Sequence, residues 1–119
     1  MIFQVRDDYF NLTNSVYTKS KGLYEDLTEG KFSFPVIHAI RADPGNHVLL
    51  NILKQKSTND AVKQQAVDYM GKMGSFTYCK AFVNDLVHQA LELLAEIENT
   101  KDLQGHLDKF KGYIKGMCL

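Results

Sequence analysis

Three oxygen-bearing side chains, Asp7, Asp8 and Asn11, lie close together near the start of this 119-residue chain. In a helix, Asp7 and Asn11 would share one face because they are four residues apart. Gln4 would lie one turn before Asp8 on a neighbouring part of the same surface. Oxygen ligands of this kind suit Mg²⁺, which usually takes one or two carboxylates, keeps several waters and binds substrate phosphates. The run therefore indicates one half of a metal and phosphate clamp; the alternative interpretation is a pair of solvated acids near a helix end.

The elements that must position these side chains are predicted to be helices, because apolar residues recur with a helical period along most of the chain. Four apolar stripes carry this period: Val48, Leu49, Ile52 and Leu53; Val62, Ala66, Tyr69, Met70 and Met73; Phe82, Leu86, Ala90, Leu93 and Ile97; Leu103, Leu107, Phe110, Ile114 and Met117. No useful length alternates with a period of two, so the sequence predicts an all-α fold.

Turn and cap residues divide the helical stretches. Pro35 can open a helix at its first turn, residues 43–46 have turn chemistry, and Ser75 is expected to be an N-cap. Residues 13–30 form a polar and irregular stretch that is long enough to be functional. His38 follows Pro35 in a mostly apolar helix, which favours a hydrogen-bonded core residue over a catalyst.

Composition excludes several classes of function. Fourteen basic and fourteen acidic residues cancel, so no net charge recruits nucleic acid or an anionic membrane. Cys79 and Cys118 lack the spacing of a disulfide framework or a metal site, which fits a reducing compartment. The first residues carry Arg6, Asp7 and Asp8 without an apolar run, which argues against a signal peptide, and no segment has the length of a transmembrane helix. A cytoplasmic protein is expected.

Several motifs resemble a known family. The sequence reads FQVRDDYFNL, then KG, EDLTEGKFSFP and IHAIR, and later LNILKQ and GSFTY. These motifs resemble the C-terminal part of the trans-prenyltransferases, specifically the geranylgeranyl diphosphate synthases, and among them the fungal enzymes most. The likeness covers most of the chain and fades over its last residues. It implies that residues 1–119 are the C-terminal portion of one polyprenyl synthase domain, with helices from the isoprenoid synthase bundle that are incomplete as a stand-alone domain.

The resemblance also implies a reaction. The family condenses an allylic diphosphate, such as farnesyl diphosphate, with isopentenyl diphosphate, and geranylgeranyl diphosphate is the product that the motifs imply. Asp7 and, to a lesser degree, Asp8 would hold Mg²⁺, while Asn11 stands where many relatives carry another aspartate and could help the metal only weakly. Lys21 and Lys31 match positions that reach the allylic diphosphate, where an ammonium group is a strong partner.

Two further implications concern the completeness of the site. Gln4 could hydrogen-bond to a lysine, a metal-bound water or the substrate, or it could pack at a helix junction. Family members carry two aspartate-rich motifs and associate as homo-oligomers, whereas adjacent aspartates occur in this chain only at Asp7 and Asp8. The chain alone is therefore expected to be catalytically incomplete.

Three hypotheses follow from the sequence. The favoured one is a C-terminal portion of a Mg²⁺-dependent geranylgeranyl diphosphate synthase that cannot complete the active site alone. The second is a non-catalytic short form that binds or regulates an intact prenyltransferase subunit through its apolar stripes. The third is a helical module that binds a diphosphate with Mg²⁺ but does not turn it over.

Overall fold

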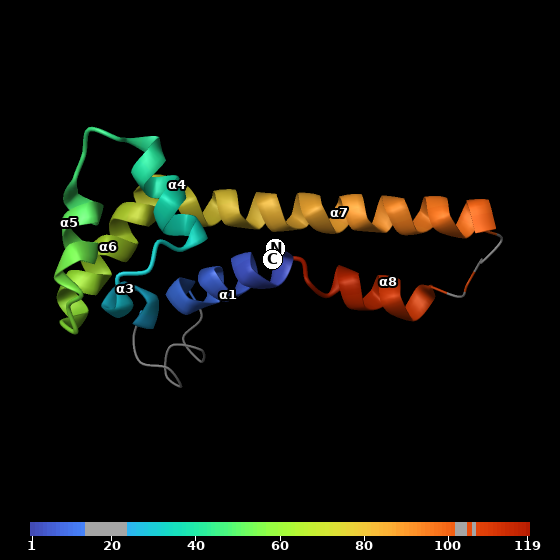
Figure 1. The fold of residues 1–119 in the computed structure, drawn as a ribbon, viewed down its shortest axis with the longest axis horizontal. Coiled ribbons are helices and arrows are strands. Elements are labelled where there is room, and N and C mark those ends of the chain that lie inside the picture. The colour runs from blue at the N-terminus through green and yellow to red at the C-terminus, as the bar shows by residue number, and fades with distance from the viewer. Residues whose placement is uncertain (14–23, 102–104, 106) are drawn as a thin grey trace. The chain divides into compact units, whose positions relative to one another are not determined.

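The chain folds into helices, and the described part contains no strand. The computed structural model describes residues 1–13, 24–101, 105 and 107–119 (Figure 1). The helices are α1 (Ile2–Thr13), α3 (Glu25–Glu29), α4 (Phe34–Ala42), α5 (Val48–Gln55), α6 (Asp60–Lys72), α7 (Ser75–Lys101) and α8 (Asp108–Lys115). The predicted all-α fold is confirmed.

The helices fall into two compact units. The first unit comprises residues 1 and 3–79, and so contains α3 to α6, nearly all of α1 and the start of α7. The second unit comprises residues 2 and 80–119, which form the rest of α7 together with α8. Every candidate site residue that the structure describes belongs to the first unit.

The core of the first unit lies where α5 packs against α6, α4 and α3 (Figure 1). Its buried apolar residues are Leu12, Leu27, Val36, Ala39, Leu49, Ile52, Leu53, Ala66 and Met70. The predicted stripes on α5 and α6 supply most of them. Val48 is the exception, because its side chain is 41 % exposed. Burying this apolar surface is the main force that holds α3 to α6 together.

The boundaries of α4 follow the predicted chemistry, and α6 begins at a cap that the sequence analysis did not name. Pro35 lies in the first turn of α4, and Asp43 follows the last residue of that helix. The start of α6 is capped by Asn59, whose side-chain oxygen accepts hydrogen bonds from the N–H groups of Ala61 and Val62 at 2.9 and 3.3 Å. Such a cap satisfies backbone donors that have no partner inside the helix.

Residues 13–30 differ from the expected irregular stretch. Residues 24–30 include α3, which begins after Tyr24 and ends at Gly30. Gly30 has a φ of 71°, a left-handed conformation that glycine adopts without a steric penalty. The sequence prediction missed this helix because a helix of five residues carries too little apolar periodicity to be recognised. Lys21 lies outside the described residues.

Two predictions for α7 also need correction. Ser75 is the first residue of the helix rather than its cap, because the carbonyl of Gly74 accepts the first helical hydrogen bond, from the N–H of Tyr78 at 2.9 Å. Farther along, the fully buried apolar residues are Val83 and Val87, one position away from the predicted stripe. Adjacent stripes on a long apolar helix differ by only one residue, so periodicity alone did not select the buried one.

In the second unit, polar contacts connect α7 with α8 and with the C-terminal residue. Lys111 forms an ion pair with Glu98 at 2.7 Å, and the backbone N–H of Leu119 donates to Asn84 at 2.8 Å. Ile114 and Met117, from the fourth predicted stripe, are buried. Phe110 and Leu107 of the same stripe are exposed and half-buried respectively, and Leu103 lies outside the described residues.

Candidate functional site

Asp8 of α1 is the centre of a buried polar cluster. Only 3 % of Asp8 is exposed. One carboxylate oxygen accepts hydrogen bonds from Gln4 Nε2 at 2.9 Å and from Lys31 Nζ at 3.0 Å. The other carboxylate oxygen accepts a hydrogen bond at 3.0 Å from the backbone N–H of Phe34, the first residue of α4. Asp8 therefore joins α1 to the segment before α4 and stabilises the start of α4 with a negative charge.

Asn11 lies one turn farther along α1 and is 2 % exposed. Its side-chain oxygen accepts a hydrogen bond from the backbone N–H of Asp26 at 3.1 Å. Asp26 is in the first turn of α3, where N–H groups lack partners within the helix. In this structure, the oxygen of Asn11 thus anchors α3 to α1.

Lys31 is held between two carboxylates. Its ammonium nitrogen is 3.0 Å from Asp8 Oδ1 and 4.0 Å from Asp26 Oδ2. Burial works against the charged form, but the hydrogen bond with Asp8 and the negative charges of Asp26, Asp8 and Asp7 outweigh burial and raise the pKa of Lys31. Its side chain is 37 % exposed, so the ammonium is charged, positioned and still partly accessible.

Asp26 is the member of the cluster that the sequence analysis missed. Burial raises the pKa of its carboxyl from 3.8 to about 6, although Lys31 acts in the opposite direction; the charges of Asp8, Asp7 and Glu29 add to the increase. Its Oδ2 atom is buried and has no hydrogen-bond partner among the described residues. The available signal was the adjacent pair Glu25 and Asp26 just before an apolar residue, which is typical of a helix first turn.

Asp7 occupies a half-buried position next to Asp8, and its charge raises the pKa values of both Asp26 and Lys31. The structure therefore brings Gln4, Asp8 and Lys31 into direct contact and places Asp7 within electrostatic range. Among the described residues, no three His, Cys, Asp or Glu side chains form a group that could hold a metal by themselves. A Mg²⁺ ion that uses one or two carboxylates and substrate phosphates does not need such a group.

An apolar cavity adjoins the polar cluster. It has a volume of about 370 Å³, and Asp8 lies in its wall. The other lining residues are Met1, Gln4, Val5, Phe32, Phe34 and Ile37. A charged cluster at the edge of an apolar cavity can hold a ligand that combines an anionic group with a hydrocarbon.

Comparison with known proteins identifies the family. The sequence model of the polyprenyl synthetase family matches residues 1–70, which include the whole polar cluster. The chain belongs to the polyprenyl synthetase family. This result confirms the resemblance seen in the motifs, and the helices agree with the all-α isoprenoid synthase fold.

Several fungal members of the polyprenyl synthetase family are similar to this chain. Geranylgeranyl pyrophosphate synthase 1 of Zymoseptoria tritici is 58 % identical over 98 residues, which cover 82 % of this chain and 29 % of that protein. Geranylgeranyl pyrophosphate synthase ltmG of Epichloe festucae is 53 % identical over 104 residues, which cover 87 % of this chain and 31 % of that protein. The Fusarium fujikuroi geranylgeranyl pyrophosphate synthase is 49 % identical over 113 residues, which cover 92 % of this chain and 27 % of that protein. The chain thus spans less than a third of the length of these relatives.

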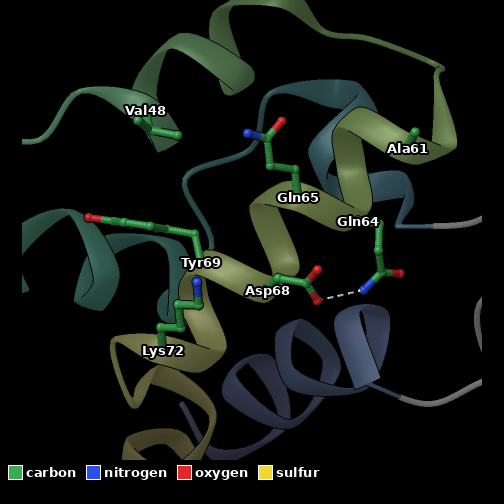
Figure 2. Close-up of a pocket in the computed structure, with 7 residues that line it drawn as sticks. All are labelled: Val48, Ala61, Gln64, Gln65, Asp68, Tyr69 and Lys72. Carbon is green, nitrogen blue, oxygen red and sulfur yellow. Dashed lines mark hydrogen bonds between the residues drawn. The ribbon is translucent and has the colours of Figure 1, made fainter.

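A second hollow lies on α5 and α6 and contains none of the residues that the sequence predicted for the diphosphate and metal site, although Val48 and Tyr69 belong to predicted apolar stripes. Its volume is about 490 Å³, and Figure 2 shows the seven residues that line it. Its one carboxylate, Asp68, accepts a hydrogen bond from Gln64 at 3.0 Å (Figure 2). Gln64 in turn accepts from the hydroxyl of Tyr24 at 2.8 Å. This surface lacks the paired carboxylates and bound lysine of the cluster around Asp8, so it is a weaker candidate for the family's chemistry.

His38 lies outside the polar cluster around Asp8 and has partners of its own. The ring nitrogen Nδ1 of His38 is 2.8 Å from the hydroxyl of Ser75, and the ring stacks on Tyr78 with centroids 4.3 Å apart. The predicted hydrogen bonding of His38 is confirmed, although the residue is half-buried rather than a core residue.

None of the described helices combines the length and the apolarity that crossing a bilayer requires.

Proposed function

We propose that this chain supplies the diphosphate-binding part of a prenyltransferase active site. The proposed reaction condenses an allylic diphosphate, such as farnesyl diphosphate, with isopentenyl diphosphate to form geranylgeranyl diphosphate. The proposal rests on the position of Lys31. Its side chain is charged and partly exposed, and its ammonium is held 3.0 Å from Asp8, which lies in the wall of an apolar cavity. The family membership and the names of the relatives support the same substrates.

The proposed cofactor is Mg²⁺, and the donors around Asp7 fit it in part. Carboxylate oxygens are the ligands that Mg²⁺ prefers, and Asp7 is half-buried rather than enclosed. Asp8 and Asn11 already accept hydrogen bonds from protein donors in this structure, so each has less acceptor capacity left for the ion. When bound, Mg²⁺ would neutralise negative charge that develops on a departing diphosphate.

The proposed work of Lys31 is to bind the diphosphate. An ammonium beside phosphate oxygens forms short, charge-assisted hydrogen bonds. Asp8 and Asp26 keep this ammonium charged and hold it in a fixed position between them. Little reorganisation is therefore needed when the anion binds. Lys21 is proposed as a second diphosphate ligand from outside the described residues, and Gln4 as a substrate-binding residue at the cavity wall.

The apolar cavity would receive the hydrocarbon next to the diphosphate. Val5, Phe32 and Phe34 line the cavity beside Asp8, and their apolar side chains would help to exclude water once further protein covers it. Exclusion of water strengthens the electrostatic interactions and protects a carbocation from hydrolysis. The cavity is open on one side, since Phe32 is 57 % exposed, and we propose that further parts of a complete prenyltransferase cover it.

A second candidate function is that of a partner for an intact prenyltransferase subunit. Large apolar side chains are exposed near the cavity: Met1 is 78 %, Phe3 60 % and Phe32 57 % exposed. Exposed apolar patches of this kind often mark protein interfaces.

We also propose that residues 1–119 form the C-terminal portion of one polyprenyl synthase domain and that the complete protein is a cytoplasmic homo-oligomer. This chain alone is proposed not to turn over the substrates.

Calorimetry with inorganic pyrophosphate tests the proposed diphosphate site. The chain should bind pyrophosphate in the presence of Mg²⁺, and binding should weaken strongly without the metal. Asp7→Ala should abolish the metal-dependent part, and Lys31→Met should weaken binding about tenfold or more, whereas the exposed Lys72→Met serves as the matched control. Equal binding by all three variants would overturn the proposal.

Co-purification separates the two candidate functions. A tagged form of this chain is mixed at micromolar concentration with a full-length fungal relative, and the product-forming activity of the complex is measured. A stable complex with altered activity favours the partner function. Absence of a complex contradicts it and leaves the diphosphate-binding part as the proposal.

A further inference from the structure

Lys63 of α6 is a buried lysine outside the cluster around Asp8. Only 5 % of it is exposed. Its ammonium donates a hydrogen bond to the hydroxyl oxygen of Thr28 at 3.0 Å and lies 3.6 Å from the carboxylate of Asp60. Burying an ammonium is costly unless it is paired, and the carboxylate of Asp60 is 70 % exposed, so the attraction between the two charges is screened by water.

The stability of α6 does not explain a lysine at this place. Lys63 is in the first turn of the helix, where the partial positive charge of the helix end disfavours a cation. The helix start is already capped, because Asn59 accepts hydrogen bonds from the N–H groups of Ala61 and Val62. The reason for Lys63 therefore lies in what its ammonium contacts.

One of the contacts of this ammonium, Thr28, belongs to the short segment that leads to Lys31. The Thr28 hydroxyl also lies 3.4 Å from the backbone carbonyl of Ser57, to which it can donate. The segment then turns at Gly30, where an added Cβ would lie 3.1 Å from the carbonyl oxygen of Leu53. The backbone N–H of Lys31 donates to the carbonyl of Asp26 at 2.9 Å. Thus α3 is attached to α5 and α6 at its end, directly before Lys31.

We propose that Lys63 is a positioning residue that acts through Thr28 to hold Lys31 beside Asp8. An α3 of five residues is too short to keep its place by its own hydrogen bonds, so contacts with neighbouring helices determine where its C-terminal end lies. Loss of the bond from Lys63 to Thr28 frees this end and lets the ammonium of Lys31 leave the carboxylate of Asp8. The role in diphosphate binding rests on the proposed function, whereas the role in placing Lys31 does not.

The first test measures the reactivity of the lysine side chains with a small acylating reagent, by peptide mass spectrometry of the folded chain. In the wild type, Lys31 should react slowly because its ammonium is bound by Asp8. In Lys63→Met and in Thr28→Val, Lys31 should react several times faster, while Lys54 and Lys80 keep their rates. Lys63→Arg retains a donor and should restore the slow rate, and Lys72→Met on the same helix is the matched control.

The second test is calorimetry with pyrophosphate and Mg²⁺ on the same variants. Lys63→Met and Thr28→Val should weaken binding about tenfold, the order of effect of residues that orient a ligand-binding group. In the Lys31→Met background, Lys63→Met should cause no further loss, because Lys63 acts only through Lys31. Circular dichroism establishes that each variant is as helical as the wild type.

The outcomes are distinct. Unchanged reactivity of Lys31 in the folded Thr28→Val variant would overturn the positioning role, and so would an undiminished effect of Lys63→Met in the Lys31→Met background. If the wild type fails to bind pyrophosphate with Mg²⁺ but Lys31 becomes reactive in both variants, the diphosphate site is wrong and the positioning role stands.

Discussion

Asp7 and Asp8 are neighbours in the sequence but differ in environment, and the difference separates two tasks. Asp8 is 3 % exposed and accepts hydrogen bonds from Gln4, Lys31 and the backbone of Phe34. Asp7 is half-buried and acts on Lys31 through its charge. The hydrogen bonds assign Asp8 to the architecture of the site, and Asp7, which is less buried than Asp8, remains the proposed metal ligand.

Stability measurements on two matched variants test this division. Asp8→Asn should lower the free energy of unfolding by about 2 to 3 kcal/mol, because the amide has one acceptor oxygen and no charge for the bond with Lys31. Asp7→Asn should lower it by less than Asp8→Asn does, because Asp7 is less buried than Asp8. Urea unfolding followed by circular dichroism gives both values, and equal losses would contradict the division.

The elevated pKa of Asp26 predicts a pH dependence of stability. The folded state, with a pKa of about 6, binds the proton more tightly than the unfolded chain, with a pKa near 3.8. The contribution of Asp26 to stability is therefore complete below the unfolded pKa and is lost as the pH rises through about 6. Asp26→Asn should remove this loss. Relative to the wild type, the variant should gain on the order of 2 kcal/mol between acidic and neutral pH. A difference that stays constant with pH would contradict the assignment.

At the scale of elements, apolar periodicity predicted α5 and α6 because each buries one continuous stripe in the core. It missed α3, which is held by contacts from outside: Asn11 binds its first turn and Lys63 binds Thr28. The sequence likewise identified Lys31 through its motif but not Asp26, whose importance arises from burial between α1 and Lys31. Local patterns record helix faces, whereas such tertiary contacts are visible only after folding.

Two glycines should respond oppositely to alanine. Gly30 ends α3 at a φ of 71°, and an added Cβ would lie 3.1 Å from the Leu53 carbonyl oxygen, so Gly30→Ala should cost about 1 to 2 kcal/mol of stability. Gly71 lies within α6 with open space around its Cα, so Gly71→Ala should add about 0.5 to 1 kcal/mol. Thermal unfolding of both variants tests the pair; a gain from Gly30→Ala would contradict the close approach of α3 to α5.

At the scale of the whole molecule, the site is built entirely within one compact unit. The polar cluster and the apolar cavity belong to the first unit, and so do all the residues that match the family model except Ile2. The chain covers 29 % of the length of the Zymoseptoria tritici relative, and two apolar side chains of the cavity wall, Met1 and Phe32, are exposed. Both facts support the proposal that the reaction needs further protein surface over this cavity.

A chimera tests whether Asp7 and Lys31 form part of a prenyltransferase site. The segment of the Zymoseptoria tritici synthase that matches this chain is replaced by the corresponding residues of this chain, and geranylgeranyl diphosphate is measured after incubation with farnesyl diphosphate, isopentenyl diphosphate and Mg²⁺. We predict an active chimera whose kcat falls by about a hundredfold or more on Asp7→Asn or Lys31→Met, since both changes remove stabilisation of the departing diphosphate. A folded chimera without activity, or one that tolerates both substitutions, would contradict the claim that these residues form part of a prenyltransferase site.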